Sequence, residues 1–284
     1  MTRPAITQPS RPLAPRAAQP ELTIVIPVWG RYVSLLEDCV ASVHAQHGVS
    51  FRILIIDNAS DDPLPELHNV EVARTPNRLS VGAARNYGLE RVTTPFVLFM
   101  DADDLLLDGA LLMMRRMLAN NPRAVAAVCR PQRWHPLTDR RWVEKRNPKP
   151  IVFFVARFPL VFALTNLRWN SFQIVEAIIR TDIATDAGGF GDADVGEDWE
   201  LCAALTFRGS VVFARSVGRV YRITDGSLWH RHHNADTRRR CHARLQRRLR
   251  ADACVPVAVR RVLLPILGRA ARRADAALPS VPAS

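Results

Sequence analysis

Short apolar runs separated by polar turns mark the first third of the chain, and each run has the length of a buried strand. These runs are Leu22–Val28, Phe51–Ile56, Val70–Ala73 and Phe96–Met100. Between them, Tyr32–His44 and Val81–Arg91 place apolar residues three or four positions apart, the spacing of a helix with one buried face. Strands that alternate with helices predict an α/β fold with a mostly parallel central sheet and helices on both faces.

Polar and acidic residues follow these strands at the points where they end. Trp29–Arg31 follows the first strand, Asp57–Asp62 the second and Asp101–Asp104 the last. Ligands bind at the carboxyl ends of the strands in open α/β sheets, so these segments predict a nucleotide crevice. Neither the glycine-rich dinucleotide fingerprint nor the GxxxxGK[ST] phosphate loop is present, which argues against dehydrogenases and P-loop NTPases.

Three carboxylates come together in the segment Asp101-Ala102-Asp103-Asp104. Because they repel one another, a divalent cation with oxygen ligands would stabilise the group and could also hold a diphosphate. The alternative is a polar loop in which Asp103 or Asp104 caps a helix over Leu105–Leu118.

Basic residues are concentrated near the C-terminus. Residues 231–284 hold 13 Arg and 3 Asp, against a net charge of +12 for the whole chain. Within them, Asp236–Arg250 places three apolar residues four positions apart, which predicts a helix with a narrow apolar stripe. This helix either packs on the domain or, with the apolar segment Val255–Leu267, lies on anionic lipid. No RNA-recognition motif accompanies the charge, so we expect no nucleic-acid partner.

The remaining features concern location. Residues 1–20 contain five prolines and predict a disordered leader. An apolar signal core is absent, and Arg157 and Pro159 interrupt the longest apolar stretch, Ile151–Leu167. The five cysteines lack CxxC spacing, which is typical of free thiols in a reducing compartment. We expect a cytoplasmic protein, or one held peripherally at the inner face of the membrane.

Six motifs in a fixed order make the chain resemble family 2 glycosyltransferases over roughly residues 22–227. They are Leu22–Arg31, Ile55–Asp62, Gly82–Gly88, Phe99–Asp104, Gly188–Phe190 and Gly196–Leu201. The resemblance implies a GT-A glycosyltransferase domain over 21–228, with a nucleotide-binding half (21–105) and an acceptor and catalytic half (106–228). Residues 229–284 would form a basic helical extension.

The resemblance also implies a reaction and a donor site. A sugar would pass, with inversion, from a UDP- or dTDP-type nucleotide-diphospho-sugar to a hydroxyl of a glycan, lipid-linked or small-molecule acceptor. Asp57 would contact the base, since a carboxylate can accept a hydrogen bond from a pyrimidine imide. Arg85 would neutralise phosphate, or would make only a structural ion pair. The donor pocket would further include Pro27, Val28, Asn58 and Ala102.

Metal and base positions follow from the same resemblance. Asp101 and Asp103 match a DxD pair for Mn²⁺ or Mg²⁺, with Asp103 as the direct ligand and Asp104 ordering the loop. Asp198 would be the general base, with Glu197 holding it or touching the acceptor. The alternative for these two acids is that they merely complement the dipole of a helix over Trp199–Phe207.

The chain departs from the family pattern at Thr224, where many members carry a His that could bind metal. The residues that could replace it are Asp225, His230, His232 and His233. This departure keeps open a different class of protein, a catalytically silent relative that binds a nucleotide sugar or a partner protein.

Overall fold

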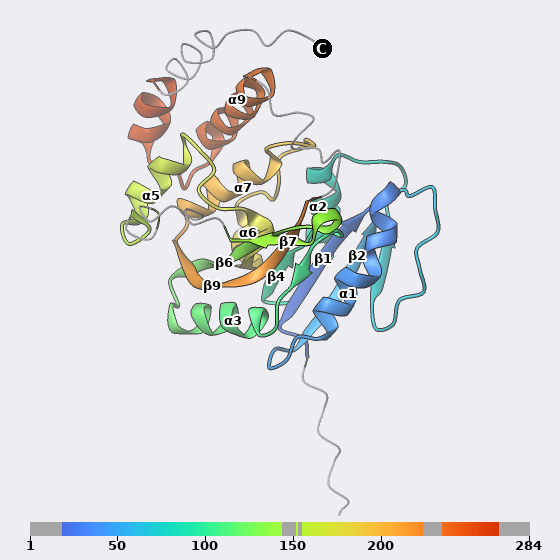
Figure 1. The fold of residues 1–284 in the computed structure, drawn as a ribbon. Coiled ribbons are helices and arrows are strands. Elements are labelled where there is room, and N and C mark those ends of the chain that lie inside the picture. Colours follow the sequence, from blue (N-terminus) through green and yellow to red (C-terminus); the bar gives the residue numbers. More distant parts are fainter. Residues whose placement is uncertain (1–18, 144–151, 153–154, 224–234, 267–284) are drawn as a thin grey trace, which may run out of the picture.

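A nine-stranded sheet organises the fold (Figure 1). The structure, a computed structural model, describes residues 19–143, 152, 155–223 and 235–266. The strands are β1 (Leu22–Val28), β2 (Phe51–Asp57), β3 (Glu71–Arg74), β4 (Phe96–Phe99), β5 (Leu105–Leu106), β6 (Ala124–His135), β7 (Arg140–Trp142), β8 (Ala177–Arg180) and β9 (Ser210–Arg222). Their order is β3-β2-β1-β4-β8-β6-β9-β5, and β7 pairs with β6 beside this path. Strands β1 to β4 are parallel to one another, as expected, and β8 runs antiparallel to both β4 and β6.

Helices cover both faces of this sheet, as the apolar spacing predicts. They are α1 (Leu36–His44), α2 (Val81–Leu89), α3 (Ala110–Asn120), α5 (Pro159–Asn166), α6 (Thr181–Asp186), α7 (Glu197–Thr206) and α9 (Ala235–Ala251). Short helical turns are η1 (Gly30–Leu35), η2 (Pro136–Thr138), η3 (Ile174–Glu176) and η4 (Val259–Leu263). One apolar core lies between the sheet and α1 with α3, and a second joins the sheet to α2, α5, α6, α7 and α9.

Helix α2 lies very close to the sheet because a glycine faces β1. A Cβ at Gly88 would lie 2.4 Å from Cγ1 of Val25, well inside van der Waals contact. The helix begins at Ser80, whose hydroxyl accepts a hydrogen bond from the N–H of Ala83 at 3.2 Å. These two features set the distance of α2 from the sheet and the residue at which it starts. They thereby set the position of Arg85, which lies on α2.

The helix predicted over Leu105–Leu118 is wrong at its start. Leu105 and Leu106 form β5, which pairs with Val220 and Arg219 of β9. Gly109 then adopts φ of +70°, and α3 begins only at Ala110. Long-range pairing with β9 therefore replaces the first turns of the expected helix. Because α3 starts six residues after Asp104, neither Asp103 nor Asp104 can cap it.

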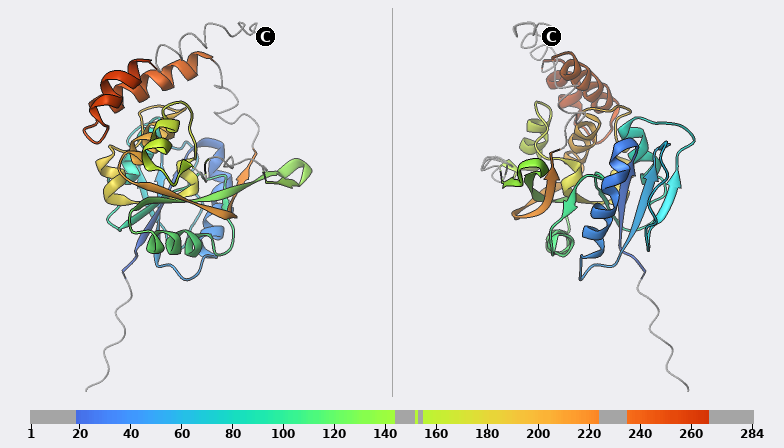
Figure 2. Two further views of the ribbon diagram at one scale, coloured as in Figure 1. Left: turned by 90° about the vertical axis from the view of Figure 1, so that its left-hand side faces the viewer. Right: turned by 45° about the vertical axis from the view of Figure 1, so that its right-hand side comes forward.

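The basic C-terminal helix, α9, packs on the domain. Cys241, Leu245 and Leu249, the predicted apolar stripe, are buried in the same core as α7. Figure 2 shows α9 at the opposite end of the molecule from α3, with the β6–β7 hairpin projecting sideways. Packing on the domain, one of the two alternatives for this helix, is thus observed.

Other expectations are only partly covered by the described residues. The leader falls almost wholly on residues 1–18, and Thr224, Asp225 and the three histidines fall on 224–234; both ranges lie outside the described part of the chain. All five cysteines are free, and four of them are buried. Within the described ranges, no helix is both long and apolar enough to cross a bilayer.

Candidate active site

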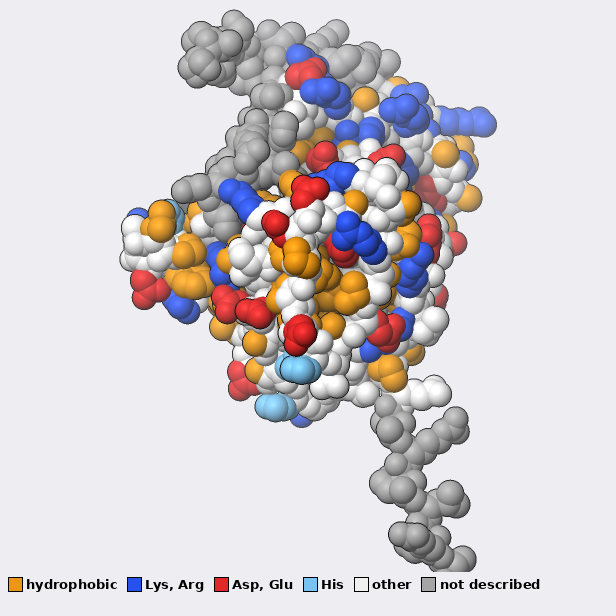
Figure 3. Space-filling view, turned by 90° about the vertical axis from the view of Figure 1, so that its right-hand side faces the viewer, with side chains coloured by type: hydrophobic (Ala, Val, Ile, Leu, Met, Phe, Trp, Pro, Cys, Tyr) orange, Lys and Arg blue, Asp and Glu red, His pale blue; other side chains and the backbone are white. Residues whose placement is uncertain are grey.

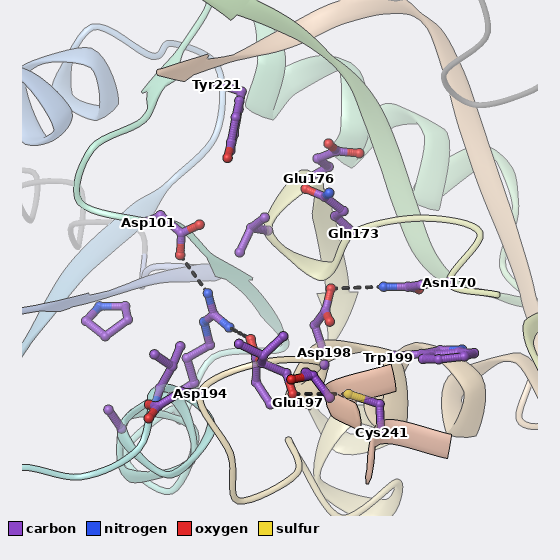
Figure 4. Close-up of a pocket in the computed structure, with 18 of the residues that line it drawn as sticks. Asp101, Asn170, Gln173, Glu176, Asp194, Glu197, Asp198, Trp199, Tyr221 and Cys241 are labelled. Carbon is purple, nitrogen blue, oxygen red and sulfur yellow. Dashed lines mark hydrogen bonds and ion pairs between the residues drawn. The ribbon is translucent and has the colours of Figure 1, made fainter. Parts of the chain in front are cut away.

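A cavity of about 760 Å³ opens at the carboxyl ends of β1 and β4 and extends to the N-terminus of α7. Figure 4 shows Asp101 on one side of it, with Asp198 and Asn170 across from it. The sequence-predicted site residues on its wall are Pro27, Asn58, Arg85, Asp101, Ala102, Asp103, Glu197 and Asp198. The fold therefore brings most of the predicted donor and catalytic residues into one cavity.

Two predicted residues, Val28 and Asp57, do not lie on this wall. Val28 is fully buried in the sheet. The buried Asp57 carboxylate accepts hydrogen bonds from the N–H of Ser60 at 2.9 Å and from the guanidinium of Arg74. The neighbouring Asn58 does reach the wall, where its side chain is bonded to the backbone of Leu79.

Arg85 joins the two predicted halves of the site. Its guanidinium donates to Asp101 at 2.6 Å and to Glu197 at 2.5 Å, and its side chain is only 5% exposed. Removal of one partner from a buried ion pair leaves the other charge buried without compensation, which is strongly destabilising. Arg85 thus makes the structural ion pairs of the alternative interpretation, and it makes them inside the cavity that a donor would occupy.

These ion pairs decide the charge of the cavity. Burial raises the pKa of Asp101, but the charges of Arg85 and Arg219 outweigh burial and hold this pKa below its usual range. Burial raises the pKa of Glu197 to about 7, against the opposing effect of Arg85 and with the help of the Asp198 charge. Burial also raises the pKa of Asp198. The carboxylate beside the β4 end stays ionised most readily, while those at the start of α7 have higher proton affinity.

The acidic cluster fits a divalent cation. Oxygen atoms of Asp101, Asp103 and Asp104 lie within 4.8 Å of one another, and carboxylate oxygens are the ligands that Mg²⁺ and Mn²⁺ prefer. Asp104 is buried, bound by the guanidinium of Arg219, and accepts from the N–H of Arg222 at 3.1 Å. Asp101 and Asp103 are the partly exposed members of the cluster that face the cavity.

Sequence reasoning missed Arg219, which supports this loop from β9. It is 1% exposed, and its guanidinium also lies 3.6 Å from Asp101 and 3.8 Å from Glu176. A buried arginine requires buried counter-charges. β9 also contains Arg215 and Arg222, so no sequence signal distinguished Arg219 from them.

Asn170 is a second residue that the sequence did not reveal. Its amide donates to Oδ2 of Asp198 at 3.0 Å, and both residues line the cavity. This bond fixes the direction of the Asp198 carboxylate. Trp199, which follows it, donates its ring N–H to the carbonyl of Asn166 at 2.6 Å and is largely buried.

Helix α9 also reaches the cavity, although it belongs to the predicted extension. It contributes Thr237, Arg238, Cys241 and His242 to the wall. Two arginines on its inner face bind α7 and the segment before it. Arg244 donates a hydrogen bond to the carbonyl of Val195 at 2.7 Å and another to Glu200 of α7 at 2.8 Å. Arg248 donates a hydrogen bond to the carbonyl of Gly189 at 2.6 Å. The C-terminal helix is therefore part of the site.

Comparison of the sequence with known proteins gives a matching family and several relatives. The family model described as "Glycosyl transferase family 2" matches residues 23–179. The succinoglycan biosynthesis protein ExoW of Rhizobium meliloti is 36% identical over 96 residues, 30% of each chain. The GalNAc(5)-diNAcBac-PP-undecaprenol beta-1,3-glucosyltransferase of Campylobacter jejuni is 32% identical over 103 residues, 32% of each chain. The matching segments thus span about a third of the length of these two relatives.

Solved structures show the same fold. Staphylococcus aureus TarS in complex with UDP-GlcNAc superposes with a TM-score of 0.63 at 12% identity, covering 82% of this chain and 67% of that one. The mannosyltransferase PcManGT of Pyrobaculum calidifontis, in complex with GDP-Man and Mn²⁺, gives 0.60 at 19% identity, covering 94% and 78%. The predicted GT-A fold is confirmed.

Proposed function

Because the chain belongs to glycosyl transferase family 2, we propose that it moves a sugar, with inversion, from a UDP- or dTDP-type nucleotide-diphospho-sugar to an acceptor hydroxyl. The observation that carries the proposal is one cavity with a metal-suited carboxylate pair, Asp101 and Asp103, on one side and an oriented carboxylate, Asp198, on the other. The first side would hold the donor diphosphate and the second the acceptor.

The chemistry needs one base and one displacement. Asp198 would accept the proton of the acceptor hydroxyl as its oxygen attacks the anomeric carbon from the face opposite the diphosphate. The bond from that carbon to the diphosphate oxygen breaks in the same step, and the nucleoside diphosphate leaves. Mn²⁺ or Mg²⁺, when bound by Asp103 and Asp101, would stabilise charge on the leaving group. Arg85 holds Asp101 and Glu197 in place on the two sides.

The relatives support an acceptor in polysaccharide or lipid-linked glycan assembly. ExoW is named for succinoglycan biosynthesis, and the Campylobacter enzyme for an undecaprenol-diphosphate acceptor. A glycan or a lipid-linked sugar is accordingly our proposed acceptor class.

A panel of nucleotide sugars tests the proposal as a whole. Purified protein should gain thermal stability with a UDP- or dTDP-sugar in the presence of Mn²⁺ or Mg²⁺, and should release the nucleoside diphosphate slowly to water. Stabilisation without any hydrolysis or transfer would instead identify the catalytically silent relative. No stabilisation by any donor would reject both.

The base contact of Asp57 is a separate prediction. Asp57→Ala should weaken UDP binding by roughly 1–3 kcal/mol, the scale for a lost hydrogen bond to a charged group. Since Asp57 also binds Arg74, the control is Arg74→Ala, which removes the ion pair and keeps the carboxylate. Calorimetry should show weaker UDP binding only for Asp57→Ala. Equal losses in both variants would assign Asp57 a structural role.

Peripheral membrane contact is proposed for the outer face of α9 and the segment after it. Arg239, Arg250 and Arg261 are exposed, and the exposed apolar residues nearby are Val257, Val262 and Ile266. Figure 3 shows basic side chains gathered along the upper edge of one face, at the level of α9. Together these features suit an anionic lipid surface.

Replacing Arg239, Arg250 and Arg261 together by Gln should weaken binding to phosphatidylserine vesicles, measured by co-sedimentation, by roughly 100-fold, since each charge contributes about 1 kcal/mol. The matched control replaces three exposed arginines elsewhere, Arg116, Arg123 and Arg215. Equal vesicle binding by both triple variants would reject this surface. Truncation is unsuitable because α9 is part of the core.

A further inference from the structure

Two arginines on the acceptor side of the cavity have no counter-charge among the described residues. Arg168 and Arg238 both line the cavity and are exposed. Neither makes an ion pair or a side-chain hydrogen bond within the described part of the chain, in contrast to Arg85, Arg219 and Arg244. Each of these exposed cations on the cavity wall is available to a ligand.

Both arginines are close in sequence to residues that contact the start of α7 or the segment before it. Arg168 lies two residues before Asn170, whose amide holds the Asp198 carboxylate at 3.0 Å. Arg238 lies one helical turn before Cys241 and His242; the His242 ring packs 4.7 Å from that of Trp199, and Cys241 donates to the carbonyl of Val195 at 3.4 Å. They belong to two separate parts of the chain, the segment after α5 and the start of α9.

The two acids at the start of α7 have partners of their own. Glu197 is paired with Arg85, and Asp198 accepts a hydrogen bond from the amide of Asn170. The donor diphosphate, in the proposed function, belongs to Asp101 and Asp103 across the cavity. The acceptor side therefore has its own cationic site, separate from the donor phosphates.

We infer that Arg168 and Arg238 bind a phosphate or diphosphate group carried by the acceptor, an inference that rests on the proposed function. Guanidinium groups bind phosphate oxygens through paired, charge-assisted hydrogen bonds. Bound there, the anion would hold the acceptor while its hydroxyl faces Asp198. The phosphate can belong to a lipid-linked sugar or to a soluble sugar phosphate, and the two sources are separable by experiment.

The test uses octyl diphosphate as the probe, titrated by calorimetry into the protein after its donor site has been filled with UDP and Mn²⁺. Each of Arg168→Gln and Arg238→Gln should weaken its binding about 10-fold, the scale of one charge-assisted hydrogen bond. The matched control, Arg247→Gln, removes an exposed arginine of α9 that does not line the cavity and should bind like wild type.

The remaining arms separate the outcomes. Octyl diphosphate binding that is unchanged in both variants, or no tighter than octyl glucoside binding in wild type, overturns the inference. Tighter binding of octyl diphosphate than of inorganic pyrophosphate assigns the anion to a lipid-linked acceptor, and equal binding to a soluble one. UDP affinity is measured first. If wild type does not bind UDP, the proposed function is rejected, and the octyl diphosphate titration still tests the two arginines.

Discussion

Asp198→Asn should lower kcat by about 10²- to 10⁴-fold, the usual cost of losing general-base catalysis. The amide keeps the shape of the side chain and can still contact Asn170, so the loss reports basicity. UDP affinity should stay near that of wild type, because Asp198 lies across the cavity from Asp101. Initial rates and calorimetry on the same preparation measure both quantities.

A control and a stereochemical test accompany this substitution. Asp182→Asn removes an exposed acid on α6 and should leave kcat unchanged. In wild type, NMR of the first-formed product should show the anomeric configuration opposite to that of the donor. Near-normal turnover by folded Asp198→Asn would move the base to Glu197, and a product that retains configuration would reject single displacement.

The acid limb of the pH profile tests the same assignment. Burial raises the pKa of Asp198, and a base works only when it is deprotonated. The rate should therefore be full above this raised pKa and fall as the pH drops through it, at a higher pH than the ordinary range of aspartate. The limb should be absent from the residual activity of Asp198→Asn.

Removal of divalent metal should abolish transfer, and Mn²⁺ or Mg²⁺ should restore it. Asp103→Asn should lower kcat/KM by roughly 10³-fold, equivalent to several kcal/mol of lost charge stabilisation. It should also raise the Mn²⁺ concentration that gives half-maximal rate. Asp103 is tested because it is the proposed direct ligand; loss of Asp101 would also break its ion pairs with Arg85 and Arg219.

The matched control for the metal is Asp182→Asn, an exposed acid on α6 that should need no more Mn²⁺ than wild type. Full turnover in excess chelator would contradict the metal assignment. It would indicate that Arg85 or other cations neutralise the diphosphate.

Local sequence patterns predicted the elements that carry the motifs. β1, β2 and β4 are buried almost throughout, so each reads as a continuous apolar run. Short motifs after strand ends then gave the residues that line the donor side, because the parallel topology brings those ends together.

Long-range contacts explain what the sequence did not reveal. Two leucines are too few to distinguish β5 from a helix, and their partner strand is more than 100 residues away. Arg219 binds Asp104, which is 115 residues away in the sequence. Asn170 lies in a segment without periodicity, 28 residues before its partner Asp198. The role of α9 follows from packing of its inner face on α7, which helical spacing alone does not orient.

The ion pair between Arg85 and Glu197 limits how chimeras between family members can be built. The family match ends at residue 179, whereas Arg85 binds Glu197 beyond it. Beside this pair, a Cβ at Gly82 would lie 1.8 Å from the carbonyl oxygen of Gly191. We expect an N-terminal half taken from another relative to fit the rest of this chain only if it brings both the glycine and the arginine of α2. A chimera designed to exchange specificity therefore has to transfer α2 together with the segment before α7.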